Sequence, residues 1–174
     1  ITVSWTFFAT AESIAAVGAV PIFVDVDPIT YCMDTSLVEK AITRKTKALL
    51  PVHFYGNCTN MEALKEIAHR YHLKIIADCA QSAGTRYKGE RRQTLGDVSC
   101  FSFFPTKNLG GAGDGGMILT NEEGIAQTCR ALKVHGAGKN GLDALRKKYD
   151  LEQKIFPNHI PVGESKYYNY LVGY

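Results

Sequence analysis

The 174-residue sequence lacks any apolar run as long as the roughly 20 residues that a membrane-spanning helix requires. It also lacks an excess of charge of one sign, because 20 Lys and Arg residues stand against 17 Asp and Glu residues, for a net charge of +3. The basic residues are dispersed, which argues against nucleic acid or an acidic membrane surface as an obligate partner. We therefore expect a soluble, cytoplasmic protein with no membrane or nucleic-acid partner.

Cysteine pairs at metal-binding or redox spacing are missing as well. The five cysteines are scattered singly, at Cys32, Cys58, Cys79, Cys100 and Cys129. The five histidines do not cluster with cysteines or carboxylates in the manner of metal ligands. This pattern favours reduced thiols in a cytosolic enzyme over a disulfide scaffold, and it predicts no metal site.

Two common nucleotide-binding motifs are absent too. No G-x-x-x-x-G-K-[ST] sequence occurs, which excludes a P-loop. The spacing Gly111-x-Gly113-x-x-Gly116 formally matches the dinucleotide fingerprint, but an apolar strand-like run follows it where a helix is required. We therefore reject a dinucleotide site at these glycines.

What the sequence does contain, in its first half, is an alternation of strand and helix patterns. Apolar runs at 1–4, 21–26, 47–53 and 73–78 predict strands, and the run at 21–26 is typical of a strand buried on both faces. Helices are predicted at 9–17, ending at Gly18, at 34–42, capped by Asp34 or Thr35, and from 59 onward. The alternation predicts an α/β fold with a mainly parallel, mixed sheet between helices.

The second half departs from this alternation. Apolar runs at 98–104 and 116–120 follow each other without a helix between them, and a helix is predicted from 121 to 134. The polar segment 136–166 predicts a long loop with one short helix near 142–149. We expect this segment to face the substrate or a partner subunit, and we expect substrate specificity to lie within 136–174.

Two residues at predicted strand ends are candidates for chemistry. Lys107 follows the aromatic run 101–104 and precedes a glycine-rich stretch, where desolvation would disfavour the charged ammonium, as a Schiff-base lysine needs. Asp78 ends the strand 73–78 at the carboxyl edge, where α/β sheets bind their ligands. The plain alternatives are a solvated turn lysine and an aspartate that caps the following turn.

Five short motifs occur in an order and spacing that carry a resemblance: Thr6–Thr10, Val24–Asp27, Pro51–Gly56, Asp78–Gln81 and Phe101–Gly116. Together they resemble the DegT/DnrJ/EryC1/StrS family of pyridoxal-phosphate-dependent sugar aminotransferases. The resemblance implies that residues 1–174 are most of the cofactor-binding large domain of a type I aminotransferase fold. It further implies that an N-terminal segment and the C-terminal small domain of the family are absent from this chain.

The resemblance also implies a role for each candidate site residue. Lys107 forms the internal aldimine with pyridoxal 5′-phosphate and then moves the proton as general acid and base, while Asp78 pairs with the pyridine nitrogen. Gln81 hydrogen-bonds the ring hydroxyl, Phe7 stacks on the ring and Ser102 binds the phosphate. The alternatives are a core position for Phe7 and, for Ser102, a hydroxyl that satisfies a backbone group.

Other residues near these motifs have less defined expectations. Trp5 competes with Phe7 as the stacking aromatic, or lies in the core or a dimer interface. His53 is the last residue of the predicted strand 47–53 and is expected to line the pocket. Asn108 and the backbone of Gly110 and Gly111 are expected to offer donors to a phosphate.

The activity implied by the resemblance is transfer of an amino group, typically from glutamate, to a keto group of a nucleotide-linked sugar in polysaccharide biosynthesis. The family forms homodimers with shared active sites, so a homodimer is expected. One alternative is a pyridoxal- or pyridoxamine-phosphate-dependent sugar dehydratase, but such relatives carry histidine where Lys107 stands. Another is a non-catalytic regulatory relative of the same fold, against which Lys107, Asp78 and Gln81 argue.

Overall fold

The computed structural model describes residues 1–89, 94–135 and 143 of the chain. The chain divides into two compact units, Ile1–Thr120 and Asn121–Tyr174, and each is described by itself. No helix in the described ranges is long and apolar enough to cross a membrane.

The first unit alternates strands and helices, as the sequence predicts. Its strands are β1 (Thr2–Val3), β2 (Phe23–Val24), β3 (Ala48–Leu49), β4 (Lys74–Asp78), β5 (Val98–Ser102) and β6 (Gly116–Thr120). Its helices are α1 (Phe8–Ala16), α2 (Thr35–Ala41) and α3 (Met61–Arg70), with a 3₁₀ turn at Phe54–Gly56. The expected α/β class with a mixed sheet is confirmed.

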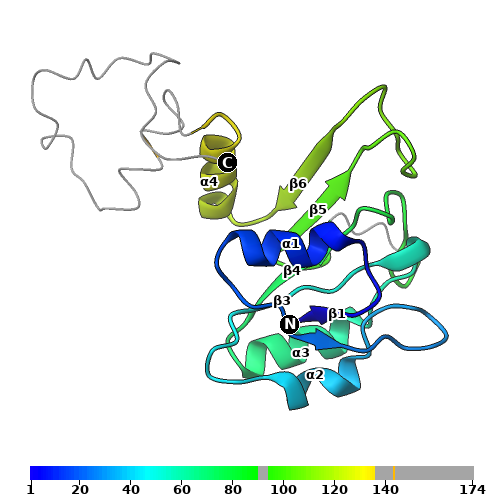
Figure 1. Ribbon diagram of the computed structural model, residues 1–174, viewed down its shortest axis with the longest axis vertical. Coiled ribbons are helices and arrows are strands. Elements are labelled where there is room, and N and C mark those ends of the chain that lie inside the picture. The colour runs from blue at the N-terminus through cyan, green and yellow to red at the C-terminus, as the bar shows by residue number, and fades with distance from the viewer. Residues whose placement is uncertain (90–93, 136–142, 144–174) are drawn as a thin grey trace, which may run out of the picture. The chain divides into compact units, whose positions relative to one another are not determined.

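The strands form a mixed sheet. Among the described strands, the pair β5 and β6 is antiparallel and the other pairs are parallel. Strands β3, β4, β5 and β6 are neighbours in that order, and β6 runs antiparallel to β5 (Figure 1). Strands β1 and β2 form a parallel pair. A parallel bridge between Thr2 and Leu50 places this pair beside β3. The parallel strands β3 and β4 therefore end at one edge, and Asp78 lies there.

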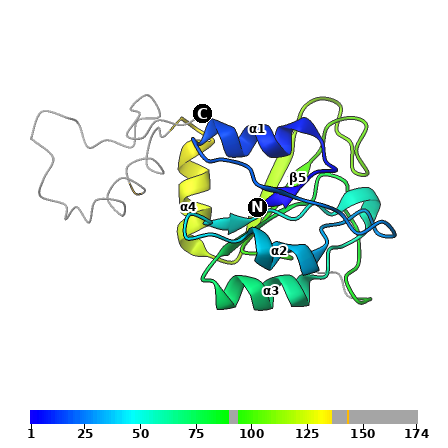
Figure 2. The same cartoon turned by 60° about the horizontal axis from the view of Figure 1, so that its bottom comes forward.

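Helices lie on both faces of the sheet: α1 on one face, and α2 and α3 on the other (Figure 2). Helix α3 buries Met61, Leu64, Ile67 and Ala68, whose spacing puts them on one helical face. These side chains belong to the main apolar cluster, which also contains Leu49 of β3 and Ile75 of β4. The Asn60 side chain caps α3 by accepting a hydrogen bond from the backbone N–H of Ala63.

The ends of the helices follow the local sequence signals. Asp34, one of the two predicted caps of α2, accepts a hydrogen bond from the backbone N–H of Ser36 at 2.9 Å. Gly18 follows α1 with a φ of +74°, a conformation that glycine adopts without the steric penalty of a Cβ.

The expectation that 21–26 is buried on both faces is wrong. In β2 only Val24 is buried, and Phe23 is 50% exposed. Among the described residues β2 pairs with β1 alone, so it lies at an edge of the sheet. A continuous apolar run predicts a strand, but it does not tell an edge strand from a central one.

The second unit contributes α4 (Glu123–Leu132) to the described residues. The helix predicted at 121–134 is therefore confirmed with slightly shorter ends. The predicted loop at 136–166 and its short helix at 142–149 lie outside the described residues, apart from Asp143.

Candidate functional site

The backbone at the end of β4 is held on one side by the segment that follows β3. The backbone N–H of Asp78 donates to the carbonyl of Pro51 at 2.9 Å, and the carbonyl of Asp78 accepts from the N–H of His53 at 3.0 Å. On the other side, Asp78 is paired in register with Cys100 of β5. The position of Asp78 is thus set by both neighbouring strands.

Within the described part of the chain, the carboxylate of Asp78 has one hydrogen-bond donor on each oxygen. Oδ1 accepts from the backbone N–H of Ala80 at 3.0 Å, which is the turn-capping contact that the sequence left open. Oδ2 accepts from the hydroxyl of Thr10 at 2.9 Å. Because a carboxylate oxygen has two lone pairs, each oxygen can still accept a further donor from a ligand.

A pocket of about 210 Å³ lies beside Asp78. It is lined by side chains from α1, among them Ala9 and Thr10, and from the ends of β4 and β5, among them Asp78 and Ser102. Ser102 therefore lies at the Asp78 pocket. Its hydroxyl accepts a hydrogen bond from the backbone N–H of Phe104 at 3.3 Å, so the backbone-satisfying alternative holds for Ser102 as the structure stands.

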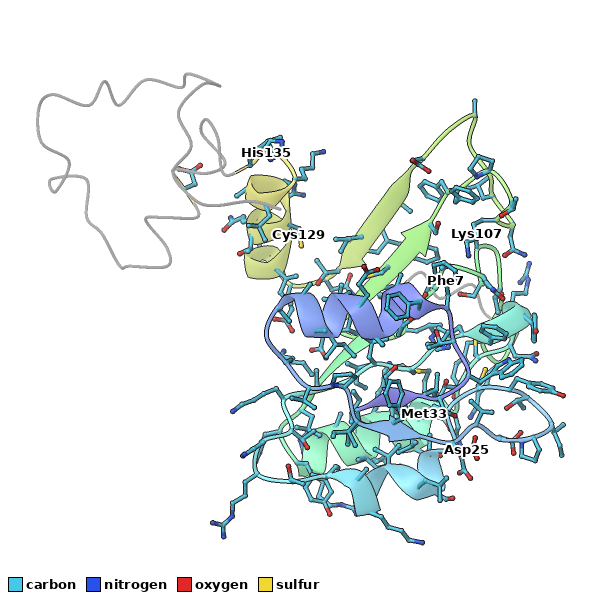
Figure 3. The ribbon with its side chains drawn as sticks, in the orientation of Figure 1. Phe7, Asp25, Met33, Lys107, Cys129 and His135 are labelled. Atoms are coloured by element: carbon cyan, nitrogen blue, oxygen red, sulfur yellow. The ribbon has the colours of Figure 1, made fainter. Side chains whose placement is uncertain are left out.

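Lys107 lies on the segment 103–115 between β5 and β6, which we call the lysine loop (Figure 3). The ends of the loop meet where the N–H of Phe103 donates to the carbonyl of Gly115 at 2.7 Å. The N–H of Lys107 donates to the carbonyl of Phe104 at 2.9 Å, and the N–H of Gly111 donates to the carbonyl of Phe103 at 2.8 Å. The Gly111 amide is therefore engaged within the loop, against its expected role as a free phosphate donor.

Glycine is required at one point of the lysine loop. A Cβ added to Gly110 would lie 2.3 Å from the carbonyl oxygen of Pro105, closer than any real contact. At Gly113, by contrast, a Cβ would meet nothing within 4 Å. The glycine-rich stretch therefore packs against its own backbone at Gly110, which argues against a purely flexible surface turn.

A second pocket, of about 450 Å³, brings Lys107 together with Gln81. Tyr55, Thr106 and Asn108 line the same pocket. The side-chain oxygen of Gln81 accepts a hydrogen bond from the backbone N–H of Tyr55 at 3.2 Å. This contact orients the Gln81 amide, whose NH₂ group can donate to a ligand.

Phe7 stands immediately before α1 and is 72% exposed, so the core alternative for this residue is wrong. Figure 3 shows Phe7 at the start of α1 and Lys107 on the loop beyond β5. Trp5, the competing aromatic, is half exposed and has ring contacts with Tyr31 and Phe54, both at 6.3 Å between centroids. Phe7 thus keeps a ring available to a ligand.

His53 does not line either pocket, and the expectation that it would is wrong. Its side chain is fully buried, and Nδ1 accepts a hydrogen bond from the N–H of Thr59 at 3.3 Å. Nε2 has no hydrogen-bond partner among the described residues. Burial lowers the pKa of His53 to about 4, so the imidazole is neutral near pH 7.

The structure groups four of the five predicted site residues into two sets, and Phe7 lines neither pocket. Asp78 and Ser102 share the 210 Å³ pocket, and Lys107 and Gln81 share the 450 Å³ pocket. The contact that sequence reasoning missed is the one between Thr10 and Asp78. Its only signal was the position of Thr10 at the end of the motif Thr6–Thr10.

Residues 1–156 match the DegT/DnrJ/EryC1/StrS aminotransferase family. The chain is 53% identical to a pleiotropic regulatory protein of Geobacillus stearothermophilus, over 79% of this chain and 37% of that protein. It is 48% identical to UDP-2-acetamido-2-deoxy-3-oxo-D-glucuronate aminotransferase of Pseudomonas aeruginosa, over 78% of this chain and 38% of that protein. The chain thus spans less than two fifths of the length of these curated relatives.

The chain is also similar to solved protein structures. DesV of S. venezuelae, in complex with a ketimine intermediate, has a TM-score of 0.74 and 44% identity, with 78% of this chain and 36% of DesV covered. The Bacillus subtilis protein ntda with bound cofactor PMP has a TM-score of 0.73 and 40% identity, with 78% of this chain and 30% of that chain covered.

Proposed function

The chain belongs to the DegT/DnrJ/EryC1/StrS aminotransferase family, and on that premise we propose that it transfers an amino group to a keto group of a nucleotide-linked sugar. The proposed cofactor is pyridoxal 5′-phosphate, and the proposed amino donor is glutamate. Two aminotransferases of nucleotide-linked sugars, from Pseudomonas aeruginosa and Micromonospora megalomicea, are each 48% identical to the chain, which supports this substrate class.

The observation that carries the proposal is the pairing of Lys107 and Gln81 in one pocket. The amine of Lys107 can form a covalent bond to an aldehyde cofactor. The side-chain amide of Gln81 is a neutral hydrogen-bond donor in the same pocket. Asp78 lies three residues before Gln81, at the end of β4. An amine for the covalent bond and a carboxylate for the ring nitrogen are two of the groups that pyridoxal phosphate takes from a protein. The amide of Gln81 adds a hydrogen-bond donor.

The described residues fit this cofactor. Asp78 has an unused lone pair on each oxygen with which to hold a proton on the ring nitrogen, and the exposed ring of Phe7 is free to cover a planar ligand. When bound, pyridoxal phosphate acts as an electron sink that stabilises negative charge on the carbon bearing the amino group.

The chain's own residues then have distinct tasks in the proposed reaction. The amine of Lys107 would move the proton in both halves of the reaction: it would take it from the carbon that bears the donor's amino group and pass it to the bound cofactor, and later it would return a proton from the cofactor to the sugar carbon. Gln81 would donate a hydrogen bond to the hydroxyl group on the cofactor ring and so fix the orientation of the ring. Ser102 would exchange its contact with the Phe104 N–H for a phosphate oxygen.

We further propose a homodimer with shared active sites, acting in the cytoplasm. Large apolar side chains exposed at the start of α1 and on β6 support an assembly of subunits: Phe8, Met117 and Ile118. The free cysteines among the described residues suit a reducing compartment. Sedimentation of the full-length protein at several concentrations tests the dimer.

Borohydride reduction tests the cofactor assignment directly. The full-length protein is incubated with pyridoxal 5′-phosphate, reduced and mapped by peptide mass spectrometry. We expect a pyridoxyl adduct on Lys107 that is lost in Lys107→Arg and kept in Lys45→Arg, because Lys45 is exposed and lines neither pocket. Adducts spread over surface lysines, with none enriched at Lys107, would refute the assignment.

A regulatory role is a second candidate, favoured by the 53% identity to the pleiotropic regulatory protein. Conversion of glutamate to 2-oxoglutarate by the cofactor-loaded protein separates the two functions. An enzyme carries out this half-reaction and loses it in Lys107→Arg. A purely regulatory protein binds the cofactor at Lys107 without the conversion.

A further inference from the structure

We propose that Thr10 is a positioning residue whose hydroxyl holds the Asp78 carboxylate in the orientation that meets the cofactor ring. This role presupposes the proposed pyridoxal-phosphate function, and it concerns a residue of α1 that does not itself take part in the chemistry.

The burial of α1 first draws attention to Thr10. Thr10 is 5% exposed and is the only buried residue of this helix. A β-branched side chain has a lower helix propensity than alanine or leucine, and a buried hydroxyl is costly unless it is hydrogen-bonded. A leucine or alanine would serve better if the position were only a packing contact. The hydroxyl therefore points to a hydrogen-bonding role.

The hydrogen bonds of Thr10 have only one possible direction. The Thr10 hydroxyl lies 2.9 Å from Oδ2 of Asp78 and 2.8 Å from the hydroxyl of Thr6. The Thr10 hydroxyl donates to Asp78, and because a hydroxyl has a single proton, the Thr6 hydroxyl is the donor toward Thr10. The result is a short chain from Thr6 through Thr10 to Asp78, in which each bond polarises the next.

The hydrogen bond from Thr10 is the second of two that hold the Asp78 carboxylate. The Ala80 N–H holds Oδ1 and the Thr10 hydroxyl holds Oδ2, so two donors from different elements determine the plane of the Asp78 carboxylate. The backbone N–H of Ala80 cannot be removed by substitution, except by proline. Thr10 is therefore the donor whose contribution can be isolated.

A second hydrogen bond of Thr10, made by its backbone, involves the aromatic candidate Phe7. The backbone N–H of Thr10 donates to the carbonyl of Phe7 at 3.1 Å, and Phe7 directly follows Thr6 in the chain. Thr10 consequently anchors the start of α1 to the end of β4. Loss of the Thr10 hydroxyl would remove a hydrogen bond to the Asp78 carboxylate and one to Thr6, the residue before Phe7.

The test compares Thr10→Val, which keeps the shape without the hydroxyl, with Thr10→Ser, which keeps the hydroxyl. The dissociation constant of pyridoxal 5′-phosphate is measured in the full-length protein by quenching of intrinsic fluorescence. We expect about tenfold weaker binding in Thr10→Val, because a hydrogen bond to a charged group is lost, and binding within about twofold of wild type in Thr10→Ser. The melting temperature of the cofactor-free protein monitors folding.

Two further variants separate positioning from packing. Thr128→Val is the matched control, because Thr128 also lies in a helix and its hydroxyl donates to the carbonyl of Gly124. We expect it to bind the cofactor like wild type. In an Asp78→Ala background, Thr10→Val should cause no additional loss of affinity, because Thr10 acts through Asp78.

Three results would overturn the role of Thr10 while leaving the proposed function intact: wild-type affinity in Thr10→Val, equal losses in Thr10→Val and Thr10→Ser, or an undiminished loss in the Asp78→Ala background. Failure of the wild-type protein itself to bind the cofactor would instead overturn both the proposed function and the role of Thr10.

Discussion

Replacing His53 with glutamine should remove a large part of the pH dependence of stability between pH 4 and pH 6.5. The imidazole of His53 is fully buried, and burial lowers its pKa from 6.5 to about 4. In the unfolded chain the same group titrates near its ordinary value. The native state therefore resists a proton that the unfolded state accepts.

The sign of the effect follows from this difference. Between pH 6.5 and about pH 4 the unfolded state binds more protons than the native state, so the stability of the native state falls as the pH falls. The contribution of His53 to the free energy of unfolding is fully present above about pH 6.5. Below pH 4 this contribution is lost, and the total loss is about 3 kcal/mol. At pH 5 the loss is already about 2 kcal/mol.

Urea unfolding at pH 7 and pH 5 measures the effect in wild type and in His53→Gln. Carboxylates also titrate in this range, so the informative quantity is the pH-dependent change in the wild type minus that in the variant. His69→Gln, at an exposed position on α3, controls for the removal of a histidine as such. Equal changes in wild type and His53→Gln would refute the reasoning, as would an NMR titration of His53 with a midpoint near 6.5.

Two other predictions concern the lysine loop and a thiol next to the site. Gly110→Ala should destabilise the protein by about 1–3 kcal/mol and weaken cofactor binding, because the new Cβ would meet the Pro105 carbonyl at 2.3 Å. Gly113→Ala, where a Cβ meets nothing within 4 Å, should be nearly neutral in the same unfolding assay, and equal effects of the two variants would contradict the geometry. Cys79 is buried and its pKa is raised to about 11, chiefly by burial, so iodoacetamide at pH 8 should leave it unmodified in the native protein. Rapid alkylation of Cys79, located by peptide mapping, would show that the thiol is accessible.

Local patterns predicted the elements of the fold correctly wherever the determining residues lie within one turn or one strand. The cap of α2 at Asp34 and the glycine after α1 are examples, because a cap bonds to a backbone group only two or three residues away. The strand that ends at Asp78 was predicted from its own apolar run. Lys107 was placed correctly on a loop between two strands for the same reason.

Predictions failed where burial depends on what packs against an element. The run at 21–26 became an edge strand with an exposed Phe23, and His53 entered the core instead of a pocket. Both outcomes depend on neighbouring strands and helices, which the local pattern does not contain. Phe7 is exposed for the same kind of reason, although its chemistry is that of an ordinary core residue.

The sequence by itself determined the chemistry available to this protein and the family to which it belongs. It supplied the amine of Lys107, the carboxylate of Asp78 and the amide of Gln81. The local sequence pattern alone places these groups at strand ends and in loops. Only the tertiary structure decided which of these groups meet. Thr10 and Asp78 are 68 residues apart in the chain, and their hydrogen bond forms because α1 packs over the carboxyl end of β4. Such a contact depends on the packing of separate elements, and no local pattern of residues records it.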